Sequence, residues 1–146
     1  MEKQNLELLT SIYQNCRIGV QSIQDIEPSV EDENLRAELR EELEQYNNFA
    51  VRCEKIAKEY EEILPDNNIL EKARLWTSIK MTTLTDKSTR HLAEMLLLGS
   101  VMGTLQCYKD LADFKGADKE LLELCGELQQ LQEKNFNYLK MFLKEM

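Results

Sequence analysis

One histidine and two glutamates are the residues of this chain best suited to bind a metal ion. His91 is the only histidine, and Glu94 follows it by three residues, so both side chains would lie on one face of a helix. With Glu42 from a neighbouring helix they would offer imidazole and carboxylate ligands to a single Fe, Mn or Zn ion. We first interpret His91 as a hydrogen-bonded structural residue in a protein without a cofactor. The metal site is the alternative.

Further polar side chains fall on positions predicted to face the protein interior. They are Tyr46, Tyr138, Gln132 and Asn135. If consecutive helices are antiparallel and turn near residues 66 and 116, His91 lies level with Glu42, and Tyr138 with Glu94. Amides in a helical core usually fix the helix register. They are poor ligands for transition metals beside carboxylate and imidazole, which disfavours a two-metal centre.

The chain lacks the motifs of common enzyme classes. It has no Gly-rich phosphate loop, no nucleophile elbow and no Ser/His/Asp arrangement, so we expect a protein that is not an enzyme. The cysteines show no CxxC or metal-finger spacing and lie on or beside apolar stripes. They are Cys16, Cys53, Cys107 and Cys125. We predict reduced, buried thiols in a cytoplasmic protein.

The apolar residues recur with the period of packed helices. In the first helix, predicted over residues 2–26, they are spaced alternately three and four apart. Pro28 ends this helix, because a proline pushes the preceding residue out of the α region. Ser29, with Asp32 three residues later, has the pattern of an N-cap. The second helix is therefore predicted to begin near Val30.

The second and third helices are predicted to differ in continuity. Apolar residues repeat four and three apart without a gap over residues 39–64, which favours a left-handed packing seam. The third helix could run over residues 69–114. Weak helix formers at 82–88 predict a kink, or a split into helices 69–81 and 86–113. The inner face of the latter is predicted to hold Ser88, His91, Met95, Leu98, Met102 and Leu105.

A fourth helix is predicted from about Asp118 to the C-terminus. Short connections make neighbouring helices antiparallel, so the predicted fold is an all-α, antiparallel up-down four-helix bundle with a single domain, residues 1–146. Gly99 and Gly103 would allow close contact with another helix, which we favour over room for a ligand beside Gln132.

Composition excludes several classes of partner. Net charge is −9 and no Lys/Arg cluster is free of interleaved Glu, which argues against binding to nucleic acid or an anionic membrane surface. No basic, apolar signal segment opens the sequence, and no apolar run approaches the length of a membrane span. Trp76, Ile79 and Met81 would overhang the other helices, and we expect a homodimer to cover them.

The segment RHLAEMLLLGSVMG, residues 90–103, resembles an uncharacterised bacterial group of four-helix bundles in the ferritin-like superfamily. The helix pattern extends this resemblance over nearly the whole chain. The usual di-iron motifs, a Glu on two helices and Glu-x-x-His on the other two, are missing. Residues 132–135 read Gln-Glu-Lys-Asn, residues 42–45 read Glu-Leu-Glu-Gln, and residues 91–94 carry the His/Glu pair in reversed order.

These observations predict a non-catalytic, ferritin-like bundle that acts by protein interaction and oligomerisation. The alternative function is a degenerate metal-binding bundle that uses His91, Glu94 and Glu42. A binder of a small molecule between the helices is a third interpretation. The sequence does not identify a specific ligand or partner.

Overall fold

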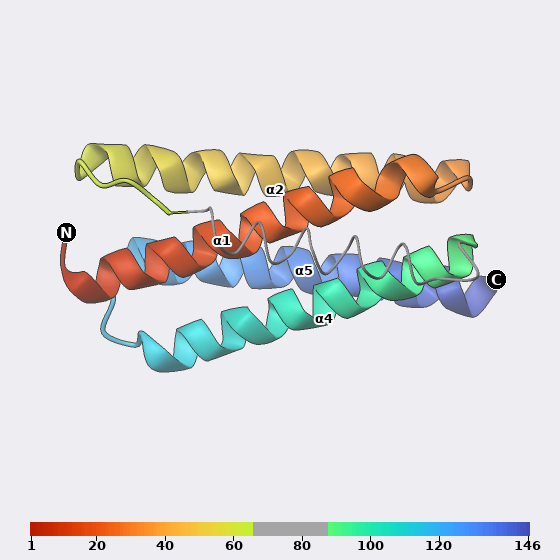
Figure 1. Cartoon of the computed structure of the whole chain (residues 1–146). Coiled ribbons are helices and arrows are strands. Elements are labelled where there is room, and N and C mark those ends of the chain that lie inside the picture. The colour runs from red at the N-terminus through yellow and green to blue at the C-terminus, as the bar shows by residue number, and fades with distance from the viewer. Residues whose placement is uncertain (66–87) are drawn as a thin grey trace.

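The computed structural model describes residues 1–65 and 88–146, and every regular element in them is helical. Helix α1 spans Lys3–Ile26, and a short 3-10 helix, η1, spans Glu27–Ser29. Helices α2, α4 and α5 span Glu33–Glu59, Thr89–Asp113 and Lys119–Glu145 (Figure 1). The predicted all-α class and helix–helix packing are confirmed. The predicted helix 69–81 and residues 82–87 of the predicted kink lie outside the described residues. Ser88 is extended and is the N-cap of α4, so this helix begins at Thr89 rather than at the predicted residue 86.

The direction of the helices differs from the prediction in one respect. Contacts of α1 with α2 and with α4 show that α1 is antiparallel to both, and Figure 1 shows α2 and α4 running the same way. A simple up-down order would make α2 and α4 antiparallel. The register estimate that placed His91 level with Glu42 assumed antiparallel α2 and α4 and is therefore wrong, whereas the predicted turn near residue 66 adjoins residues that the structure does not describe.

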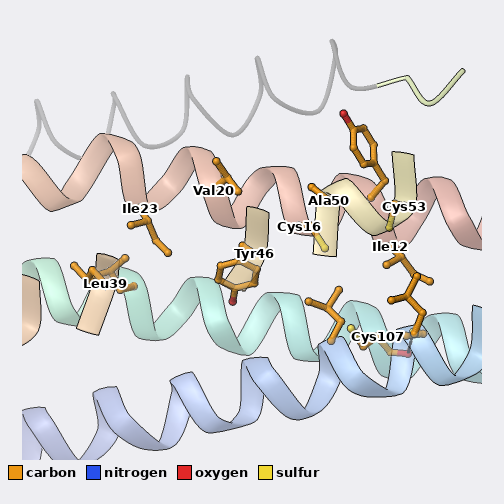
Figure 2. Packing of buried hydrophobic residues seen from close by; sticks show 14 of the residues in the cluster. Ile12, Cys16, Val20, Ile23, Leu39, Tyr46, Ala50, Cys53 and Cys107 are labelled. Carbon is orange, nitrogen blue, oxygen red and sulfur yellow. Dashed lines mark hydrogen bonds between the residues drawn. The ribbon is translucent and has the colours of Figure 1, made fainter. Parts of the chain in front are cut away.

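The apolar repeats of α1 and α2 form the core. Leu9, Tyr13, Cys16 and Val20 of α1 are buried, as predicted. From α2, Tyr46, Ala50 and Cys53 pack towards them, and Ile12, Ile23 and Leu39 lie in the same cluster (Figure 2). All four cysteines are free and buried, as predicted. Burial raises the pKa of the Cys53 thiol to about 12, so it stays protonated at neutral pH.

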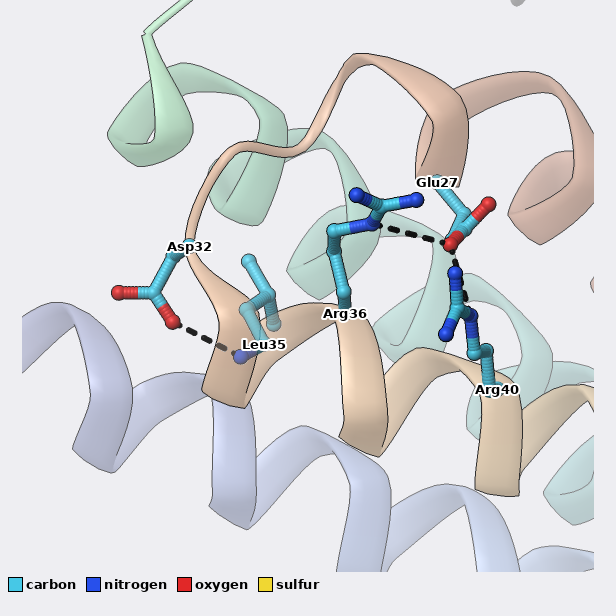
Figure 3. A network of polar contacts seen from close by, with 5 residues as sticks. All are labelled: Glu27, Asp32, Leu35, Arg36 and Arg40. Atoms are coloured by element: carbon cyan, nitrogen blue, oxygen red, sulfur yellow. Dashed lines mark hydrogen bonds and ion pairs between the residues drawn. The ribbon is translucent and has the colours of Figure 1, made fainter.

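The start of α2 lies further along the chain than predicted. Asp32, not Ser29, is the N-cap: its Oδ1 accepts a hydrogen bond from the Leu35 N–H at 2.9 Å (Figure 3). Glu27 in η1 then accepts hydrogen bonds from the Nε atoms of Arg36 and Arg40 at 3.2 and 3.1 Å. The intervening residues form the 3-10 turn, which the capping pattern alone did not indicate.

Helix α2 also ends earlier, at Glu59. The Glu61 and Glu62 N–H groups donate to the Lys58 and Ala57 carbonyls, and Glu61 has a φ of 57°. This is a Schellman ending, which usually has glycine at the left-handed position. With glutamate there, the sequence carried no stop signal, and the apolar repeat suggested a helix to Leu64.

Candidate functional site

His91 and Glu94 lie together in the first turns of α4, at the protein surface. The His91 Nδ1 and Glu94 Oε2 atoms are 3.2 Å apart, and the two side chains are 41% and 46% exposed. Arg90 Nε is 3.4 Å from the other Glu94 carboxylate oxygen. The predicted pairing of His91 with Glu94 is therefore present, but it faces outward rather than into the bundle.

Glu42 lies inside the bundle, on α2, with 3% of its surface exposed. Among the residues that the structure describes, no three His, Cys, Asp or Glu side chains gather where they could hold a metal ion. Glu42 thus does not join His91 and Glu94 in such a group. Metal binding by these residues stays a prediction.

A network of hydrogen bonds joins α1, α4 and α5 at the centre of the bundle. Gln132 Nε2 donates to Asn15 Oδ1 at 2.9 Å, and Asn15 Nδ2 donates to the Gly103 carbonyl at 3.1 Å. The Cys107 thiol donates to Gln132 Oε1 at 3.3 Å. Gln132 was predicted to be buried, whereas Asn15 was not identified. Its spacing from Ile12 and Gly19, three and four residues, was the available signal.

Glycine permits this network to form. A Cβ atom at Gly103 would lie 2.9 Å from Gln132 Cδ and 3.1 Å from Asn15 Oδ1. Gly19 packs against the Tyr46 ring, where an added Cβ would lie 3.1 Å from ring carbons. A Cβ at Gly99 would meet no atom of the described residues within 4 Å. The predicted close contact with another helix therefore holds for Gly103 and not for Gly99 within the described part of the chain, and Gly19 makes a close contact with α2.

The other predicted buried polar residues divide into two groups. Tyr46 and Asn135 are buried, and Asn135 Nδ2 donates to the Tyr46 hydroxyl at 3.4 Å. Burial raises the pKa of Tyr46, so its hydroxyl stays protonated. Tyr138 is only half-buried: partial burial, and then the carboxylates of Glu38 and other residues, raise its pKa. Its charged neighbours include Glu38 and Glu42 of α2, and the prediction that it lies level with Glu94 of α4 stays a prediction.

A cavity of about 580 Å³ lies between α1 and α4, within the size range of small-molecule sites. The apolar part of its lining includes isoleucines of α1 and Met95, Leu96 and Met102 of α4. Glu42 and Tyr46 of α2 and Gln132 of α5 also line it. Burial, followed by the neighbouring carboxylates Glu38 and Glu41, raises the pKa of Glu42 to about 8. Its Oε2 atom is buried and has no hydrogen-bond partner.

The outer face of α4 is apolar and exposed. We call it the α4 face; it consists of Leu98, Val101, Met102, Leu105 and Tyr108, each 43–59% exposed. The prediction that Leu98, Met102 and Leu105 point inward is wrong. The buried positions of α4 are instead Leu92, Ala93, Leu96, Ser100, Cys107 and Asp110. Because α4 is apolar on two sides, its periodicity fits two orientations and did not distinguish them.

The chain has no match among protein-family models, curated proteins or solved structures. In the described ranges, none of the helices combines the length and apolar character needed to cross a bilayer.

Proposed function

We propose that this protein is a non-catalytic helical bundle that acts by association, and that it forms a homodimer through the α4 face. The observation that carries the proposal is the continuous row of large apolar side chains along one side of α4. Their spacing of three, one, three and three residues places them on a single helix face. An exposed apolar row of this kind is typical of a protein–protein contact.

The α4 face fits a second copy of itself. In an antiparallel pair of α4 helices centred between Val101 and Met102, Leu98 of one copy lies level with Leu105 of the other. Apolar side chains would thus meet apolar side chains along the centre. A two-fold interface requires such self-complementarity, because the same patch is used on both subunits.

The charged residues that flank the α4 face complement each other in the same arrangement. Glu94 of one copy lies level with Lys109 of the other, and Arg90 lies level with Asp113. All four residues are exposed in the single chain, and the contact between Arg90 and Glu94 within α4 would be exchanged for contacts with the second copy. A parallel pair in register would instead place each charge level with its own kind.

We further propose that the bundle is ferritin-like and cytoplasmic. Ferritin-like bundles contain one long crossover connection, and the parallel α2 and α4 agree with that connectivity. The four buried free thiols agree with a reducing compartment. The missing di-iron motifs support association rather than oxygen chemistry as the function.

Sedimentation velocity over a range of concentrations tests the dimer. Replacing both Leu98 and Leu105 by serine should raise the dissociation constant roughly 1000-fold or more, because each leucine is buried twice in a symmetric dimer. Met141→Ser, at an exposed apolar residue of α5, is the control and should leave the dimer intact. A wild-type chain that stays monomeric at high micromolar concentration would contradict the proposal.

Cysteine cross-linking tests the antiparallel arrangement. Val101→Cys should form a disulfide-linked dimer under mild oxidation, because residue 101 of each copy lies at the two-fold axis. Leu98→Cys should not, since the two copies of residue 98 would be about 10 Å apart along the helix axis. The native cysteines are buried, which limits background cross-linking. Equal cross-linking at both positions would indicate a parallel pair instead.

A further inference from the structure

The cavity between α1 and α4 combines an apolar wall with one buried acid. The residues that α1 and α4 contribute to it, such as Ile18, Ile23 and Met95, carry no charge. Glu42 is the one carboxyl group among the described lining residues, and no Lys, Arg or His is among them. An anionic ligand would therefore find no described positive partner in the cavity wall.

Glu42 is a buried carboxyl group that is only partly hydrogen-bonded: it hydrogen-bonds the Glu38 side chain, but its Oε2 atom has no partner among the described residues. A buried polar atom without a partner costs about 1–3 kcal/mol, and native proteins contain few of them. Glu42 Oε2 is such an atom, and it belongs to a side chain that borders the cavity. A group that enters the cavity and hydrogen-bonds this oxygen would remove that cost.

We propose that this cavity binds an organic ammonium ion, an amine with an apolar body, whose charged nitrogen pairs with Glu42. The apolar body would lie against the isoleucine and methionine side chains, and the ammonium N–H groups would donate to the carboxylate. Gly99 leaves space on the α4 side, because an added Cβ atom there would meet no described atom within 4 Å. This proposal rests on the cavity rather than on the dimer, and the two sites share one residue, Met102, which belongs to both the cavity lining and the α4 face.

The charges around Glu42 favour a cation over a neutral ligand. Glu38 and Glu41 on its own helix make the potential at Glu42 more negative, and Lys134 of α5 opposes them in part. Without a ligand, burial first, then the charge of Glu38 and the hydrogen bond to its side chain, raise the pKa of Glu42 to about 8 and keep it protonated at neutral pH. When an ammonium ion binds, the Glu42 O–H proton passes to solvent and the carboxylate pairs with the ammonium. Binding should therefore release one proton.

Three probes with the same apolar body separate the ligand classes: 4-phenylbutylamine, 4-phenylbutan-1-ol and 4-phenylbutanoic acid. Isothermal titration calorimetry of the full chain should detect binding of the amine, at least tenfold weaker binding of the alcohol, and no binding of the acid. In buffers of different ionisation enthalpy, amine binding at pH 6.5 should release about one proton. Its affinity should rise up to tenfold per pH unit from pH 6 and level off above pH 8.

Glu42→Gln should weaken amine binding at least tenfold and leave alcohol binding unchanged. Glu44→Gln, at an exposed site of the same helix, is the matched control and should bind the amine as wild type does. If the acid binds as tightly as the amine, if none of the probes binds at millimolar concentration, or if Glu42→Gln has no effect, the proposal is wrong. If Glu42→Gln does not fold, the three probes and the proton release in wild type decide the question.

Discussion

Helices α4 and α5 are of similar length and pack against each other, yet they divide their apolar residues differently. In α5 the large apolar residues Leu121, Leu124, Leu128 and Leu139 are buried, and charged residues occupy much of its outer side. In α4, Leu92 and Leu96 are the only large apolar residues that are buried. All residues of the α4 face are exposed.

The two helices therefore differ in how much of their apolar surface the described part of the chain covers. The apolar face of α5 is covered mainly by α4, with contributions from α1 and α2 of the same chain. Helix α4 carries more apolar surface than the described part of the chain covers. Its polar contacts with α1 and α5 fix its orientation, so it cannot bury the α4 face by turning around its own axis. In the dimer proposed above, the second copy would cover this surface.

The largest expected effect comes from truncating a leucine on each helix. Leu128→Ala should lower the free energy of unfolding by about 2–5 kcal/mol, because it leaves a cavity around a side chain that is fully buried. Leu105→Ala, at a residue 58% exposed, should change the stability of the monomer by no more than about 0.5 kcal/mol. Urea unfolding at low protein concentration measures both. Equal losses would mean that the α4 face is packed within the chain.

The second prediction concerns the side of α4 that borders the cavity, where Glu42 should make the stability of the chain depend on pH. Its pKa in the folded chain, about 8, lies above the usual 4.5, so the folded chain retains a proton that the unfolded chain loses between these values. Stability from this group is therefore present below pH 4.5 and is lost as the pH rises towards 8. Relative to Glu42→Gln, wild type should lose about 3 kcal/mol between pH 5 and pH 8. Urea unfolding at several pH values measures this difference. If the free energy of unfolding of wild type and of Glu42→Gln changed with pH in the same way, the raised pKa of Glu42 would be disproved.

Two glycines test the two sides of α4 with the same substitution. Gly103→Ala should cost about 2 kcal/mol, because the new Cβ displaces Gln132 and breaks its hydrogen bond with Asn15. Gly99→Ala should instead stabilise the chain by about 0.5–1 kcal/mol, since alanine favours the helix and the space is open. Thermal unfolding measures both, and destabilisation by both would show that the Gly99 side is filled.

The smallest expected effect concerns the N-cap residues of α4 and α5, Ser88 and Asp118. Ser88 caps α4 by accepting a hydrogen bond from the His91 N–H, whereas the Asp118 side chain makes no such bond at the start of α5. Ser88→Ala should cost about 0.5–1 kcal/mol, and Asp118→Ala only about 0.3 kcal/mol through the helix dipole. Chemical denaturation of both variants tests this order, and the reverse order would contradict the assigned caps.

Much of the fold could be predicted because α1, α2 and α5 each have one apolar face. That pattern placed Tyr46, Gln132 and Asn135 in the interior correctly. It failed for α4, whose two apolar faces left the orientation open, and the error moved His91 and Glu94 from the surface into the predicted core. The direction of α4 relative to α2 could not be predicted from periodicity, which is the same for either direction of the chain.

The arrangement of the helices has a consequence for the order of folding. Contacts within the α1–α2 and α4–α5 pairs join residues such as Tyr13 and Glu54, 41 apart, or Cys107 and Gln132, 25 apart. Contacts between the two pairs span longer separations, up to the 117 residues between Asn15 and Gln132. Closing long loops costs more entropy, so each pair can form early and the pairs dock afterwards. We expect this docking to limit the folding rate, with the Asn15–Gln132 hydrogen bond forming late.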